Sequence, residues 1–108
     1  MDELVYLEKE EAVCSSLDVA SHFGKKHKNV IRSIEEIKKN SSAQNWAQSF
    51  REVSYKDKSG KTNKMYLMNR DGFSFLVMGF TGKKANDWKW QYINAFNQME
   101  KIIRERQS

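Results

Sequence analysis

The chain is predicted to fold as a single α+β domain, and three features of its sequence predict this class. Residues 16–37 have the pattern of two helices joined by a glycine-led turn. Residues 50–68 read as two strands around a turn that contains Gly60, as in a β-hairpin. Residues 83–106 carry an apolar stripe at helical spacing. At 108 residues, with 39% hydrophobic and 31% charged side chains, the chain can bury one modest core.

The N-terminal residues are expected to form two short strands before the first helix. These strands are predicted over Leu4–Leu7 and Glu11–Cys14, with Glu8–Glu10 as the link. Ser15 or Ser16 then has the side chain of a helix N-cap. Asp18 follows Ser15 at the spacing of a capping box. The sequence therefore predicts a short β element that leads directly into the two-helix segment.

The corner between the two helices is the most specific local pattern in the chain. Ala20 is small enough for the helices to approach each other, and Gly24 tolerates the positive φ of the turn. Val30 follows as the apolar anchor of the second helix, which is expected to end at Lys39. A small residue, a turn glycine and a downstream aliphatic residue at these spacings are typical of a helix-turn-helix.

The second helix divides into an apolar and a basic face at 100° per residue. The apolar face contains Val30, Ile31, Ile34 and Ile37, with His27 packed at the helix start. The outer face contains Lys25, Lys28, Asn29, Arg32, Ser33 and Glu36. Lysine and arginine reach phosphates or guanine edges, and asparagine pairs with adenine. This face is therefore predicted to contact duplex DNA, the alternative being a solvated helix face.

A lysine-rich hairpin is expected to follow the two helices. Lys56, Lys58, Lys61 and Lys64 surround its turn, whose one acidic residue is Asp57. A basic hairpin directly after a helix-turn-helix predicts a winged helix, whose Lys56, Lys58 and Lys61 would lie along the DNA backbone or the minor groove and contact phosphates. The alternative is a solubilised hairpin tip, because exposed lysines also protect a sheet edge from aggregation.

The C-terminal third is expected to be helical. A short helix over Asp71–Met78 should bury its apolar residues, and Thr81 should cap a long helix over residues 83–106. The apolar stripe of that helix runs from Ala85 to Ile103. Apolar residues near the chain end or off the stripe predict a homodimer or partner surface: Trp90, Ile93, Met99, Ile102 and Ile103. The alternative is that the helix folds back on the domain.

Charge and composition exclude several classes of protein. The net charge of +5 divides into −4 over residues 1–11 and +9 over the remainder, which favours a nucleic-acid partner. The longest apolar stretch, Phe73–Phe80, is too short to cross a membrane, and the acidic N-terminus lacks a signal peptide. The single Cys14 cannot form an internal disulfide. A cytoplasmic protein without a membrane partner is therefore expected.

Residues that could support catalysis or bind a cofactor are sparse. The segment GFTGKK lacks the GxxxxGK[ST] spacing of a nucleotide-binding loop, although Lys83 and Lys84 could contact a phosphate. His22, expected at the surface, and His27 make a poor metal site with the lone Cys14. Cys14 also has no evident base beside it. We therefore expect no metal, no cofactor and no enzymatic activity.

Three stretches together resemble the phage regulatory protein Rha family. They are VASHFGKKHKNVIRSIEEI, KMYLMNRDGFSFLVMGFTGKKA and YINAFNQME, within Cys14–Glu100. The resemblance implies a phage or prophage protein with a winged-helix-like domain that regulates phage or host genes. It also aligns a basic cluster with the family's FGK-x-HK-x-V segment, namely Lys25, Lys26, His27, Lys28 and Asn29. Lys64 stands where the family often has proline, and Asn69 where it often has threonine.

Two functional hypotheses remain. The first is a dimeric regulator that binds double-stranded DNA through the helix-turn-helix and the basic hairpin. The second is a phage protein that uses the same fold to occupy a host protein, such as a repressor or a nucleic-acid-handling defence complex. Such a protein would dock through an apolar patch, for example Trp90 and Ile93. The pattern specifies neither the operator nor the direction of regulation.

Overall fold

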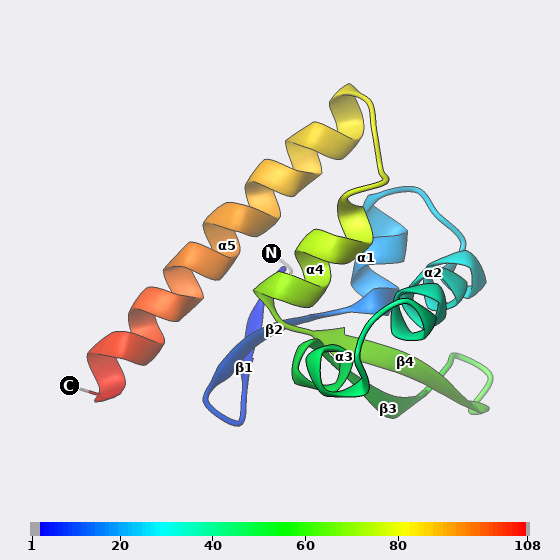
Figure 1. The fold of residues 1–108 in the computed structure, drawn as a ribbon, viewed down its shortest axis with the longest axis horizontal. Helices are drawn as coiled ribbons and strands as arrows, with labels where there is room; N and C mark the ends of the chain where they lie inside the picture. The colour runs from blue at the N-terminus through cyan, green and yellow to red at the C-terminus, as the bar shows by residue number, and fades with distance from the viewer. Residues whose placement is uncertain (1–2, 108) are drawn as a thin grey trace.

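The computed structural model describes residues 3–107, and in this range it contains a four-stranded antiparallel sheet and five helices (Figure 1). The strands are β1 (Tyr6–Glu8), β2 (Glu11–Ser15), β3 (Phe50–Lys56) and β4 (Thr62–Met68), in the order β1-β2-β4-β3. The helices are α1 (Ser16–His22), α2 (His27–Lys39), α3 (Ala43–Ser49), α4 (Arg70–Val77) and α5 (Lys83–Gln107). The predicted α+β class is confirmed. No helix in the described range is long and apolar enough to cross a membrane.

Strand β2 joins the N-terminal hairpin to the β3–β4 hairpin in one sheet. It pairs with β1 through Tyr6↔Val13 and with β4 through Cys14↔Met68. Figure 1 shows α1, α4 and α5 on one side of this sheet. Because side chains alternate along a strand, the sheet sends Cys14 and Met68 towards the helices, where both are buried.

The core between sheet and helices is largely aromatic. Tyr92 and Phe96 of α5 are fully buried, and the Phe73 ring of α4 stacks on Tyr92 with centroids 4.8 Å apart. The guanidinium of Arg70 donates to both carboxylate oxygens of Glu100, over 2.9 and 3.1 Å, and so ties the start of α4 to α5. The position of α5 is therefore set by aromatic packing and by a two-point ion pair.

The side chain of His22 was expected at the surface, and this expectation is wrong. The ring stacks on Trp88 with centroids 4.2 Å apart, and Nδ1 lies 2.7 Å from the Tyr92 hydroxyl. Burial raises the pKa of Tyr92 far above its ordinary value. The histidine therefore links α1 to α5.

Helix α4 buries only part of its apolar side chains. Phe73, Leu76 and Val77 are buried as expected, but Phe75 is 58% and Met78 69% exposed. The expectation that the whole segment is core is wrong, because an eight-residue helix against one neighbouring layer buries one side. Helix α5 begins at Lys83 as expected, and the residue directly before it, whose carbonyl accepts the Asn86 N–H, is Gly82 and not the predicted cap Thr81.

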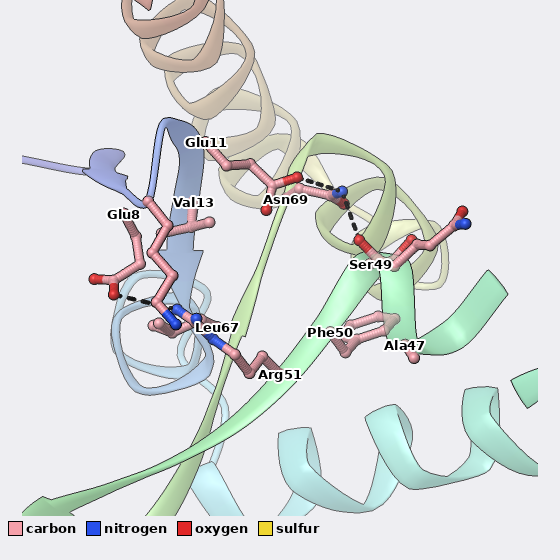
Figure 2. A pocket seen from close by; sticks show the side chains of 11 residues that line it. Glu8, Glu11, Val13, Ala47, Ser49, Phe50, Arg51, Leu67 and Asn69 are labelled. Atoms are coloured by element: carbon pink, nitrogen blue, oxygen red, sulfur yellow. Dashed lines mark hydrogen bonds and ion pairs between the residues drawn. The ribbon is translucent and has the colours of Figure 1, made fainter. Parts of the chain in front are cut away.

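The N-terminal hairpin is attached to the rest of the sheet by polar contacts around a small pocket of about 160 Å³ (Figure 2). Arg51 pairs with Glu8 over 3.3 Å, and the Asn69 amide donates to Glu11 over 3.3 Å. Strand β1 is shorter than predicted. Its turn to β2 holds Lys9 at φ 51° and Glu10 at φ 66°, a left-handed conformation unusual for such residues.

Candidate nucleic-acid interface

Helices α1 and α2 meet at the predicted glycine-led corner. The Ser15 hydroxyl accepts the Asp18 N–H over 3.0 Å and starts α1 as expected. Gly24 has φ 67°, and the Lys25 N–H donates to the Ala20 carbonyl over 2.9 Å. Residues 23–26 thereby connect the two helices, and the predicted turn is confirmed.

Helix α2 is fixed on its inner side by apolar packing and by hydrogen bonds to α1 and α3. Val30 and Ile34 are buried as predicted. The buried Ser16 hydroxyl accepts the Tyr66 N–H of β4 and lies 2.9 Å from Nε2 of His27. Burial lowers the pKa of His27 and favours its neutral ring. The half-buried indole of Trp46 donates to the Ile34 carbonyl over 3.2 Å, so α3 also supports α2.

The predicted DNA-contacting residues lie on the outside of this corner. Four cations and one amide are exposed: Lys25, Lys26, Lys28, Arg32 and Asn29; Ser33 is half-buried. Lys25 belongs to the turn and Lys26 occupies the N-cap, because α2 starts at His27. None of the four cations lies in an ion pair within residues 3–107. We call these six residues the basic strip.

The C-terminal half of α2 has a different electrostatic character. Glu35 accepts a hydrogen bond from Lys64 of β4 over 2.8 Å, and this contact holds the pKa of the carboxyl below its ordinary value. Glu36 pairs with Lys39 over 3.5 Å. Lys64, which the sequence grouped with the hairpin lysines, is therefore engaged by α2. Lys38 in this half lies over the Trp46 ring, 4.8 Å from its centroid. Carboxylates of α2 are thus paired with Lys39 and Lys64 in the C-terminal half, whereas the N-terminal half and the preceding turn carry cations without a carboxylate partner among the described residues.

The loop between β3 and β4 is organised around one carboxylate. Asp57 accepts from the Ser59 hydroxyl over 2.6 Å, the Lys61 N–H over 3.0 Å and the Asn63 amide over 2.7 Å. These hydrogen bonds lower the pKa of Asp57. Gly60 has the positive φ predicted for it, 86°. The lysines at this loop are exposed: Lys56, Lys58 and Lys61.

Two neighbouring segments flank α2. On one edge, the Tyr55 ring of β3 contacts the His27 ring at 6.2 Å, and Lys64 pairs with Glu35. On the other edge, a groove of about 320 Å³ separates α2 from the loop between α4 and α5. Figure 1 shows α2 between that loop and the β3–β4 hairpin. The basic strip is therefore an exposed edge with structured segments on both sides.

The family model of phage regulatory protein Rha matches residues 14–101. The chain belongs to the phage regulatory protein Rha family. The resemblance seen in the sequence is thereby confirmed.

Relatives of this Rha family member occur in bacteria and in a phage. An uncharacterized protein of Haemophilus influenzae is 38% identical over 99 residues, which cover 91% of this chain and 57% of that protein. A 22.8 kDa protein of Salmonella phage P22 is 34% identical, over 95% of this chain and 52% of its own. YoqD of Bacillus subtilis is a prophage-derived protein with the provisional name of an antirepressor. It is 31% identical over 91% of this chain and 40% of its own length.

The chain spans about half the length of the curated relatives it matches. No solved structure matches it.

The two lysines proposed for a phosphate contact lie outside the basic strip of this Rha family member. Lys83 and Lys84 are exposed in the first turn of α5, and Lys83 pairs with Asp87 over 2.9 Å. Figure 1 shows this turn at a distance from the β3–β4 hairpin. A phosphate contact there remains a prediction, and it would be separate from the hairpin.

The predicted partner surface on α5 is only partly exposed. Trp90 is 65% and Ile102 48% exposed, whereas Ile93 is half-buried. Met99 and Ile103 pack partly against the core. Although both lie near the end of the helix, other parts of the chain cover part of each side chain. Figure 1 shows the last turns of α5 extending beyond the other elements. Trp90 and Ile102 are the better candidates for a partner contact.

Several features relevant to function had no clear signal in the sequence. Phe75 and Met78 border a groove of about 580 Å³ between α3 and α4, and periodicity alone did not show that they are exposed. Phe80 lines the groove beside α2, although it lies 50 residues beyond Val30.

Within residues 3–107, no group of three or more histidine, cysteine or acidic residues could hold a metal ion. Cys14 is buried, which raises the pKa of its thiol.

Proposed function

We propose that this member of the Rha family binds duplex DNA as a winged helix-turn-helix regulator. The observation that carries the proposal is the basic strip, whose four cations lie in no ion pair within the described residues. Uncompensated cations on a structured edge suit a polyanion, because phosphate contacts release counterions. The strip also lies at the start of α2, and recognition helices contact bases with their N-terminal residues.

The residues of the strip divide by chemistry into two groups. Lys25, Lys26 and Lys28 would contact phosphates as flexible point charges. Asn29, Arg32 and Ser33 would contact base edges, with arginine suited to guanine and asparagine to adenine. The hairpin would act as a wing, with Lys56, Lys58 and Lys61 on the backbone. Lys83 and Lys84 would add a separate phosphate contact.

A homodimer is the expected assembly, because one recognition helix covers only a few base pairs. The exposed apolar side chains of α5, Trp90 and Ile102, are the proposed contact. Pairing through such residues would place two copies of α2 on two half-sites of a palindromic operator.

Salt-dependent binding tests the proposal most directly. A preferred duplex would be obtained by binding-site selection, and its affinity measured by fluorescence anisotropy at several salt concentrations. Replacing Lys25, Lys28 and Arg32 with Ala should reduce the slope of log affinity against log salt by about two to three. The matched control replaces Lys101, Arg104 and Arg106 of α5 with Ala, an equal change in charge. Equal effects of the two triple variants would contradict binding through the strip.

Single substitutions separate base readers from phosphate contacts. Asn29→Ala or Arg32→Ala should cost about 1–3 kcal/mol on the preferred site and relax its sequence preference. Lys25→Ala or Lys28→Ala should weaken binding to all duplexes alike. A changed preference in the lysine variants would reverse these roles.

The second candidate function is binding to a host or phage protein, and one groove favours it. Phe75 and Met78 expose apolar surface beside Trp46, and polar residues of α3 and α4 rim the same groove. Exposed apolar surface with a polar rim is typical of protein-binding sites. The provisional antirepressor name of YoqD is consistent with a protein target. Pull-down with nuclease treatment would test it: a Phe75→Ser/Met78→Ser variant should lose the protein and keep its DNA affinity.

A further inference from the structure

The groove on the outer edge of α2 brings an aromatic residue from another part of the fold to the basic strip. It is lined by Lys25, Asn29, Val30, Ser33, Gly79 and Phe80. The first four come from the helix-turn-helix, and the last two from the loop between α4 and α5. The groove therefore has polar side chains on one wall and an aromatic ring on the other.

Phe80 is held in place by contacts on both its backbone and its ring. Its N–H donates to the Val77 carbonyl over 2.9 Å, and its carbonyl accepts from the ammonium of Lys89. Its ring packs against the Phe23 ring with centroids 5.3 Å apart. The Lys25 ammonium lies 5.0 Å from the Phe80 centroid, a cation–π contact. Phe80 is half-buried, and it lines the same groove as Asn29.

The groove has the two chemistries needed to read an A·T base pair. Asparagine forms a bidentate hydrogen bond with adenine in the major groove, and apolar side chains contact the 5-methyl group of thymine. Asn29 offers the amide, and the half-buried Phe80 offers the apolar surface in the same groove. Lys25 at the same groove can contact the adjacent phosphate.

We propose that Phe80 is a specificity-determining residue that contacts the 5-methyl group of a thymine in the base step read by Asn29. The inference rests on the proposed DNA binding. It extends the base-reading surface beyond the helix-turn-helix to the loop between α4 and α5.

Replacing each thymine of the selected duplex in turn with deoxyuridine tests this proposal, because deoxyuridine lacks only the methyl group. The wild-type chain should lose affinity about four-fold at one thymine, the value expected for one buried methyl group. The loss should vanish in a Phe80→Ala variant, which binds the thymine and deoxyuridine duplexes equally. The other thymines of the same duplex serve as controls.

A Phe80→Leu variant covers the case in which Phe80→Ala does not fold, because leucine preserves apolar packing on Phe23. It should retain part of the methyl discrimination. If the wild type binds its site but no deoxyuridine changes affinity, or if the loss persists in both variants, the proposal is overturned while DNA binding stands. If the wild type does not bind any selected duplex, the proposed function fails and this inference falls with it.

Discussion

Helices α2 and α5 bury their apolar sides in the same core but expose different chemistry to solvent. α2 buries Val30 and Ile34, and α5 buries Tyr92 and Phe96. The exposed cations at the start of α2 lie in no ion pair within residues 3–107. By contrast, ion pairs occur along the length of α5: Lys83–Asp87, Arg70–Glu100 and Lys101–Glu105.

This difference separates charge that serves the fold from charge that is available to a ligand. Glu100 holds α5 against α4 through Arg70, so that ion pair has a structural role. A cluster of unpaired cations repels itself in the free protein, and an anionic partner relieves that repulsion. Two exposed residues of α5, Trp90 and Ile102, are large and apolar, and these suit a protein partner.

The largest expected effect is on stability, and it tests whether the buried sides of α2 and α5 contribute equally to the core. Phe96→Ala on α5 should destabilise the chain by about 3–5 kcal/mol and Ile34→Ala on α2 by about 2–5 kcal/mol, because each leaves a cavity in the core. The melting temperature, followed by circular dichroism, should fall by roughly 10 °C or more. The control Gln91→Ala, on the exposed side of α5, should stay within about 0.5 kcal/mol. A small loss in Phe96→Ala alone would show that α5 is not part of the core.

The next effect tests the outer side of α5. Wild-type protein should be dimeric at tens of micromolar, and Trp90→Ser or Ile102→Ser should yield monomers, because each buried apolar side chain contributes about 1.5–3 kcal/mol. Light scattering would measure the mass. A monomeric wild type would end the dimer proposal, and a variant that remains dimeric would exclude its residue from the contact.

A smaller effect is expected on the salt dependence of DNA binding when lysines of the hairpin near α2 are replaced, compared with lysines of α5. Lys58→Ala/Lys61→Ala in the hairpin should reduce the salt slope of DNA binding by about two and leave the selected sequence unchanged. The corresponding pair on α5, Lys83→Ala/Lys84→Ala, should have less effect, because Lys83 is already paired with Asp87. Anisotropy titrations and binding-site selection measure both quantities. A changed consensus for the hairpin variant would show that the hairpin reads bases.

The smallest expected effect is the pH dependence of stability that comes from His27, at the start of α2. Burial lowers the pKa of His27 below its ordinary 6.5, so the unfolded chain takes up this proton first as the pH falls. The stability from neutral His27 is therefore present above pH 6.5 and is lost as the pH falls towards the folded pKa. NMR titration should place the ring below 6.5, and His27→Gln should remove this part of the pH dependence of unfolding. A ring that titrates at or above 6.5 would contradict the assignment.

Local pattern in the sequence was sufficient for much of the fold and for the basic strip. Helical periodicity separated the inner Val30 and Ile34 from the outer Lys28 and Arg32, because a helix repeats its faces every 3.6 residues. The turn at Gly60 followed from the residue itself, since glycine readily adopts positive φ. The motifs around these elements were also sufficient to recognise the Rha family.

Tertiary structure decided which apolar side chains are exposed, which charged side chains are paired, and which residues from distant segments become neighbours. Periodicity assigns residues to a face but does not say whether another element covers it, so it missed the exposed Phe75 and the pairing of Lys64 with Glu35. Lys9 and Glu10 adopt a left-handed turn that their own preferences disfavour, within a hairpin that cross-strand pairing holds. Only folding brings Phe80 and Asn29 to the same groove, because contacts between segments about 50 residues apart leave no local pattern.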